Sequence, residues 1–254
     1  MSYIAPERSV ANERASFMTR VYVWMGLALI VSGITAFIAA CATFEQFVSL
    51  AETNALAEIC VDMSVQFITW FYLSGNGYTF WILAIGEIAL VWWISAGIRK
   101  MSTTVAAVSF VAYSVVNGLT LSAVFMVYSP KSIVGVFGVS AALFFAMSLY
   151  GATTKSDVLS YGRYFMMALI GLIVVSVVNM FMHSNMLDWI ISVATVIIFT
   201  GITAYDTRKM LIISEQATDD DCFKKASIIG ALELYIDFIN IFLALLRLFG
   251  RDRD

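Results

Sequence analysis

Long apolar runs, separated by short polar segments, dominate the chain. A helix needs about 20 apolar residues to cross the hydrocarbon core of a bilayer, and six runs reach that length. These six runs are 21–42, 79–98, 103–127, 132–152, 164–182 and 187–207. A seventh run, 228–249, is apolar at most positions but contains Glu233, Asp237, Asn240 and Arg247. The pattern predicts an all-α polytopic membrane protein.

Composition supports this interpretation. Of the 254 residues, 61 % are hydrophobic and 13 % are charged, whereas soluble domains contain about 45–50 % apolar residues. The net charge of −3 is too small to indicate a nucleic-acid partner. The cysteines Cys41, Cys60 and Cys222 are too far apart for a metal or redox motif. We therefore expect a polar arm over 1–20 and a single membrane domain over 21–250, without a cofactor.

Lysine and arginine residues are unevenly distributed between the two ends of the predicted spans. They are concentrated in the arm 1–20 and after the second, fourth and sixth spans, whereas the alternate segments contain only Lys131. Because cytoplasmic loops are rich in Lys and Arg, this predicts a cytoplasmic N-terminus. The acidic segment 43–78 then lies outside, either as a solvated connector or as an interfacial helix. The run 228–249 either crosses completely or forms a re-entrant or central helix.

Four carboxylates lie in the apolar runs or at their edge, namely Glu87, Asp206, Glu233 and Asp237. Placing an Asp or Glu at the bilayer centre costs about 2.5–3.5 kcal/mol, so such side chains rarely lack a partner or a task. Glu233, Asp237 and Asn240 are spaced i, i+4 and i+7 and therefore share one helix face. This polar stripe predicts a buried polar centre or a pore lining. The alternative is a helix at the membrane interface with its acids in water.

Asp206 stands at the C-terminal end of the sixth predicted span. Taken alone, it is compatible with an interfacial carboxylate beside Arg208 and Lys209. If its side chain meets Asp237, two like charges at close range cannot both stay ionised, and the pair shares a proton. By residue count Asp237 lies roughly 14 Å into its run. The two meet only if the sixth helix continues through 210–213 or the seventh begins lower in the bilayer.

Glu87 lies in the middle of the second predicted span. Asn117 and Thr120 in the third span are candidate partners, because a neutral glutamate can hydrogen-bond to both. The alternative is a protonated glutamate with a purely structural role. Arg99 lies about 18 Å further along the second helix, too far to pair with Glu87 but at the level of Asp206. Arg99 is otherwise an ordinary cytoplasmic flank.

Several motifs together resemble one known family. The run Gly230–Gly250 closely resembles the last-helix signature of the Bax inhibitor-1 family. The segments Thr203–Thr207 and Asn117–Ser122, the seven-run layout and the basic N-terminal arm resemble that family too. The resemblance covers residues 15–250, and the long segment 43–78 is more similar to the bacterial branch.

The resemblance implies six transmembrane helices that surround a central seventh, in a bacterial inner membrane. It also implies a pH-sensitive calcium leak rather than an enzyme, with calcium as the permeant ion. In that family two aspartates on the last two helices share a proton, and the matching positions are Asp206 and Asp237. An arginine latch on this pair would match Arg99, and a membrane-buried glutamate would match Glu87.

The remaining polar residues of the runs extend this hypothesis. Glu233, Asn240 and Asn117 are candidates for the pore lining or polar core, together with Glu87. Calcium prefers hard oxygen ligands, so Glu233 and Asp237 are candidates for transient contacts with the ion. A carboxylate-lined path also suits a cation better than an anion.

Two other functions stay open at this stage. A non-conducting membrane regulator that binds a protease or a stress-response partner also fits the family. An intramembrane aspartyl protease places two aspartates on consecutive helices, the first in a Tyr-Asp pair. Its second aspartate follows Gly-x-Gly, however, where this chain has Leu234-Tyr235-Ile236.

Overall fold

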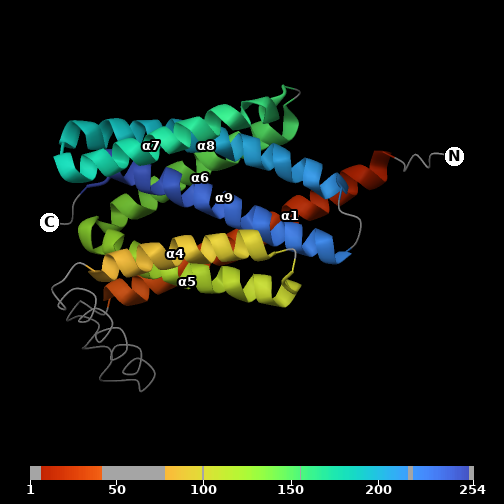
Figure 1. The fold of residues 1–254 in the computed structure, drawn as a ribbon, viewed down its shortest axis with the longest axis horizontal. Helices are drawn as coiled ribbons and strands as arrows, with labels where there is room; N and C mark the ends of the chain where they lie inside the picture. Colours follow the sequence, from red (N-terminus) through yellow and green to blue (C-terminus); the bar gives the residue numbers. More distant parts are fainter. Residues whose placement is uncertain (1–6, 42–77, 99, 155, 217–219, 252–254) are drawn as a thin grey trace, which may run out of the picture. The chain divides into compact units, whose positions relative to one another are not determined.

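The computed structural model describes residues 7–41, 78–98, 100–154, 156–216 and 220–251 (Figure 1). Within these ranges the chain forms seven α-helices and one 3-10 turn. They are α1 (Glu7–Cys41), α4 (Tyr78–Gly97), α5 (Thr103–Val127), α6 (Pro130–Thr153), η2 (Val158–Tyr161), α7 (Gly162–Met182), α8 (Asn185–Gln216) and α9 (Asp220–Phe249). Six helices are long and apolar enough to cross a membrane, whereas α4 has a shorter apolar stretch, Ile82–Gly97. The predicted all-α architecture is confirmed.

The described helices belong to two compact units. The first contains α1 as far as Met25 and the segment from Pro130 to Arg251, which includes α6 to α9. The second contains α1 from Gly26 onward, with α4 and α5. In this second unit α4 packs on α5. The Ser32 hydroxyl of α1 also donates a hydrogen bond to the Ser114 carbonyl of α5 (2.9 Å).

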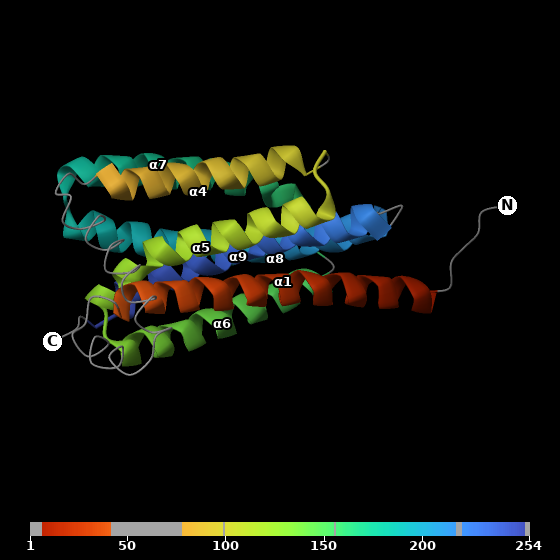
Figure 2. The same ribbon diagram turned by 90° about the horizontal axis from the view of Figure 1, so that it is seen from below.

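In the first unit α8 is the helix against which the others pack. It contacts α6, α7 and α9, and α6 also contacts α9; both ribbon views show α8 and α9 side by side (Figures 1 and 2). Aromatic rings fill the α6–α9 contact, where Phe238 meets Phe137 and Phe144 edge-on at centroid distances of 5.2 and 5.7 Å. Such edge-to-face pairs stabilise packing beyond the area they bury.

Burial distinguishes the helices of this unit sharply. In the most apolar 18-residue stretch of α9, 72 % of the residues are buried. The corresponding share is 28 % in α8 and zero in the span that contains α7. The exposed face of α7 carries large apolar side chains such as Ile170, Val174 and Phe181. An apolar helix of this length with an exposed apolar surface is suited to lipid contact. A helix as polar and as buried as α9 is instead suited to contact with protein.

Two helices extend beyond the apolar runs that predicted them. α8 continues to Gln216, past the predicted end at 207, and α9 begins at Asp220 instead of 228. Charged side chains do not end a helix, because Lys, Arg, Leu and Met all have high helix propensity. This continuation of α8 is one of the two conditions under which the sequence allowed Asp206 and Asp237 to meet. The predicted polar arm 1–20 is likewise helical from Glu7 onward.

Gly151 allows α6 and α8 to approach closely. A Cβ atom at this position would lie 2.8 Å from the Ala204 Cα atom and closer still to its carbonyl oxygen. Backbone atoms cannot yield as a flexible side chain does, so we expect Gly151→Ala to destabilise the fold by about 1–3 kcal/mol. Thermal unfolding of the purified protein in detergent measures this effect.

Gly138 on the same helix is the matched control for that substitution. A Cβ atom there meets nothing within 4 Å, and replacing a helical glycine by alanine adds helix propensity. Gly138→Ala should therefore leave the unfolding temperature unchanged or raise it slightly. Equal unfolding temperatures for the two variants would contradict the close α6–α8 contact.

Candidate functional site

Two buried aspartates lie where α8 packs against α9. Asp206 is 8 % exposed and Asp237 is 3 % exposed, and they are the two acidic residues buried in the described part of the chain. Their carboxyl groups are close enough to interact electrostatically, and the charges of Glu233 and Lys209 also act on Asp237. The structure thus brings the two aspartates into one acidic cluster, formed by Asp206, Glu233 and Asp237.

Asp237 is the innermost member of the acidic cluster. Its Oδ2 atom is buried and has no hydrogen-bond partner among the residues that the structure describes. Thr203, fully buried on α8, is a side-chain neighbour of the same carboxyl. The Thr203 hydroxyl already donates its hydrogen to the Phe199 carbonyl (2.8 Å).

Lys209 supplies the positive charge of the site, and the sequence interpretation missed this role. Its Nζ atom lies 2.8 and 2.9 Å from the two carboxylate oxygens of Glu233 and 4.0 Å from Asp206 Oδ1. The side chains of Lys209 and Glu233 are about one third exposed, at 35 % and 30 %. The sequence did contain one indication of this role, because Asp206 and Lys209 are three residues apart and therefore neighbours on one helix face. In the sequence, however, Lys209 was indistinguishable from an ordinary cytoplasmic flank.

A chain of three hydroxyl groups lies beside Asp206. Thr207, the next residue, is hydrogen-bonded to Ser148 of α6 (2.8 Å), and Ser148 is hydrogen-bonded to Tyr22 of α1. Thr207 and Ser148 are at most 1 % exposed. The chain connects α1, α6 and α8 through buried hydroxyl groups that satisfy one another. It therefore holds the part of α8 that carries Asp206 in place.

Glu87 lies in the second unit, where both of its carboxylate oxygens have partners. Thr120 donates to Oε1 at 2.6 Å, and the Asn117 amide donates to Oε2 at 3.4 Å. These are the two residues of α5 that the sequence offered as partners. Glu87 is thus held between α4 and α5 by neutral donors.

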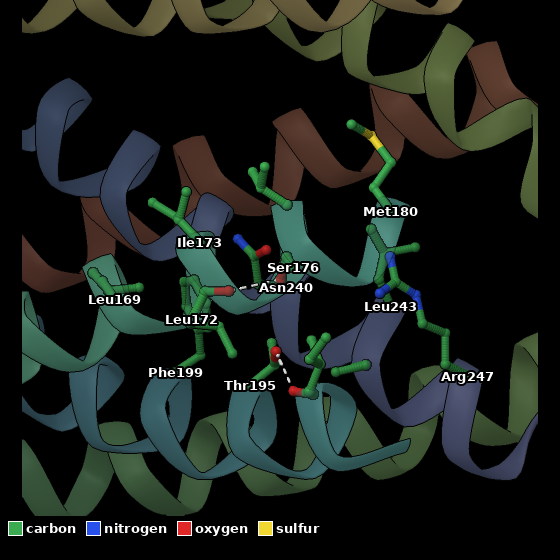
Figure 3. A pocket seen from close by; sticks show the side chains of 13 residues that line it. Leu169, Leu172, Ile173, Ser176, Met180, Thr195, Phe199, Asn240, Leu243 and Arg247 are labelled. Atoms are coloured by element: carbon green, nitrogen blue, oxygen red, sulfur yellow. Dashed lines mark hydrogen bonds between the residues drawn. The ribbon is translucent and has the colours of Figure 1, made fainter. Parts of the chain in front are cut away.

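The three residues of the polar stripe on α9 lie in two different environments. Glu233 and Asp237 belong to the acidic cluster, whereas Asn240 donates to the Ile236 carbonyl (2.8 Å) and lines a cavity between α7, α8 and α9 (Figure 3). Arg99, the predicted latch, lies outside the described residues. Within the described ranges no group of three metal-ligating side chains forms a metal site.

Comparison with known proteins agrees with the motifs at this site. A family model described as "Inhibitor of apoptosis-promoting Bax1" matches residues 14–254. The chain belongs to the Bax inhibitor-1 family. The family prediction from the sequence is thereby confirmed over nearly the whole chain.

Bacterial relatives extend this assignment. The inner membrane protein YbhL of Escherichia coli (strain K12) is 40 % identical over 250 residues, which cover 96 % of this chain and 97 % of the relative. An uncharacterized protein of Deinococcus radiodurans is 33 % identical over 248 residues, covering 98 % and 95 % of the two chains. The apolar helices and the relative's name together indicate an integral inner membrane protein, as predicted.

Proposed function

We propose that this protein is a pH-sensitive calcium leak, gated by a proton that Asp206 and Asp237 share. The observation that carries the proposal is the burial of both carboxyl groups at the α8–α9 contact, with Asp237 Oδ2 unpartnered among the described residues. Two carboxylates in such a place cannot both be ionised at low cost. A pair of this kind titrates as one unit and holds its first proton tightly.

Ionisation of both carboxyl groups produces an electrostatic repulsion that favours a change in conformation. Two unit charges at 4 Å repel by about 4 kcal/mol at an effective dielectric constant of about 20. Reversing a closed–open equilibrium from 1:99 to 99:1 takes about 5.5 kcal/mol. Repulsion between two ionised carboxylates in contact is thus of the same order as the energy that such a transition needs. Asp206, Glu233 and Lys209 are the charged groups that act on Asp237 and set the pH at which this happens.

The remaining parts of the proposal concern the path of the ion. By resemblance to the family, α9 is the central helix that the other six surround. The lysine and arginine distribution indicates a cytoplasmic N-terminus. Glu233 and Asp237 make transient contacts with calcium, and Asn240, Asn117 and Glu87 belong to the polar core. Arg99 is the latch on the aspartate pair by resemblance to the family. The protein has no catalytic role in this proposal.

Calcium flux from reconstituted liposomes tests the function. Liposomes that contain the purified protein and a calcium-sensitive dye should take up calcium at a rate that depends on pH. The pH dependence should approach about tenfold per pH unit at its steepest, as expected for one proton. Protein-free liposomes are the control for passive leakage.

The same experiment separates the proposal from its alternatives. A flux that does not depend on pH would contradict gating by the aspartate pair. Absence of flux, together with a stoichiometric membrane protein that co-purifies, would indicate the non-conducting regulator. Cleavage of a membrane substrate that requires both aspartates would indicate the protease.

A further inference from the structure

A cavity of about 450 Å³ lies between α7, α8 and α9, apart from the acidic cluster (Figure 3). This volume is within the range of about 300–1,000 Å³ that is typical of small-molecule sites. Its walls are mostly long apolar side chains, among them Leu169 and Leu172 of α7, Phe199 of α8 and Leu243 of α9. The cavity is open along one side of α7, because Ile173 and Met180 line it and are 61 % and 43 % exposed. Val174, 56 % exposed on the same helix, lies outside the lining.

Three polar side chains of the cavity wall donate hydrogen bonds to backbone carbonyls of their own helices. Ser176 donates to the Leu172 carbonyl and Thr195 to the Ile191 carbonyl, both at 2.7 Å. The Asn240 amide donates to the Ile236 carbonyl. Hydroxyl and amide groups that bond their own backbone leave the wall apolar in character. An apolar molecule can therefore lie against the two hydroxyl groups without leaving either donor unpaired.

One end of the cavity is cationic. Arg247 is the single charged residue of the lining, and no carboxylate lines the wall with it. In the portion of the chain that the structure describes, no ion pair involves its guanidinium. A guanidinium offers five N–H donors in a planar arrangement that matches a carboxylate. The unpartnered charge at this end is complementary to an anionic head group.

The ends of α7, α8 and α9 show which end of the cavity lies near the membrane interface. α7 ends at Met182, α8 begins at Asn185 and α9 ends at Phe249, so these termini share one end of the unit. Arg247 lies in the last turn of α9, whereas Asn240 lies about 10 Å further in along the helix. Figure 3 shows Arg247 and Leu169 at opposite ends, with Asn240 between them. The charge is thus at the helix ends, near the membrane interface, and the apolar part extends inward.

We propose that this cavity binds a single-chain anionic amphiphile, a fatty acid taken up from the membrane. The carboxylate pairs with the Arg247 guanidinium at the interface. The alkyl chain extends past Leu243 and Leu172 toward Leu169 in the interior of the membrane. Charge complementarity selects the acid, and the volume of about 450 Å³ suits one alkyl chain. Binding does not require that the acidic cluster gates an ion.

Photolabelling with a palmitate that carries a diazirine in its chain tests the site. The full-length protein in detergent is labelled, and cross-linked peptides are mapped by mass spectrometry. Labelling should be saturable, displaced by unlabelled palmitate, and located on the cavity-facing residues Leu172 and Leu243. Arg247→Gln should weaken binding about tenfold, because a charge-assisted bidentate contact is lost. Arg247→Lys keeps the charge but not the bidentate geometry, so its affinity should lie between those of the wild type and Arg247→Gln.

A matched pair of tryptophan variants separates the cavity from the lipid-facing surface. Leu172→Trp fills the cavity and should abolish labelling, whereas Val174→Trp lies on the exposed face of the same helix and should not. Equal labelling of the two variants, with cross-links spread over α7 residues outside the cavity lining, would show non-specific binding to the apolar surface and overturn the proposal. Equal labelling by the methyl ester of the same probe would also overturn it, since the ester has no charge for Arg247. If Leu172→Trp does not fold, the Arg247 variants decide the question.

Discussion

Asp237→Asn makes calcium flux through the reconstituted protein independent of pH. Asparagine has the shape of a protonated aspartate but cannot lose the proton. The variant should therefore show, at every pH, the flux of the wild-type protein at low pH. Where the wild-type flux changes by up to about tenfold per pH unit, the variant should change by less than about twofold. Dye-reported flux in liposomes over the neutral pH range measures both.

Variants of the partner aspartate, Asp206, and of an exposed acid, Asp188, provide the comparisons for this experiment. Asp206→Asn should have the same effect as Asp237→Asn, and the double variant should add nothing, because one proton belongs to the pair. Asp188, an exposed carboxylate on the same helix as Asp206, is the control, and Asp188→Asn should titrate like the wild type. A wild-type pH profile in Asp237→Asn would remove the basis of the proposed gating.

Lys209→Met destabilises the protein and shifts its pH response. The substitution keeps the apolar part of the side chain but removes the ammonium that contacts both carboxylate oxygens of Glu233. Glu233 then lies unpaired beside Asp206 and Asp237. The loss should be about 1–3 kcal/mol in the free energy of unfolding. The flux midpoint should move to higher pH, because a missing positive charge favours the protonated pair.

A double-mutant cycle isolates this contact. Adding Glu233→Gln to Lys209→Met removes the stranded charge and should recover part of the stability. Lys225→Met breaks the pair between Lys225 and Asp221 on α9, 2.7 Å long, in which Asp221 is 60 % exposed. The carboxylate left behind faces water, so the cost should be less than about 1 kcal/mol. Equal losses in Lys209→Met and Lys225→Met would mean that the acidic cluster does not depend on Lys209. Chemical unfolding in detergent supplies the stabilities.

Local chemistry made much of the fold predictable from the sequence. The length of each apolar run indicated a membrane-spanning helix, because a helix covers a fixed distance per residue. The cost of a carboxylate in hydrocarbon indicated Asp237 and Glu87 as residues that need partners. For Glu87 even the partners, Asn117 and Thr120, were accessible from the sequence, since both lie on the helix that follows.

Helix ends and helix faces were harder to predict. The apolar runs placed Asp206 at the end of its helix, yet α8 continues to Gln216. The stripe of Glu233, Asp237 and Asn240 suggested one common environment, but Asn240 lines the cavity while the two acids face α8. Helical spacing places side chains on one face. The neighbours of that face at each level depend on how the surrounding helices pack.

The sequence by itself determined the family, the membrane-spanning helices and the buried acids, because each depends on residues close together in the chain. Only the tertiary structure decided that Lys209 pairs with Glu233, 24 residues away, and that Arg247 ends an apolar cavity. It also decided that Gly151 admits the backbone of Ala204. Such contacts depend on the rotation and crossing of packed helices, and no periodicity within a single helix encodes them.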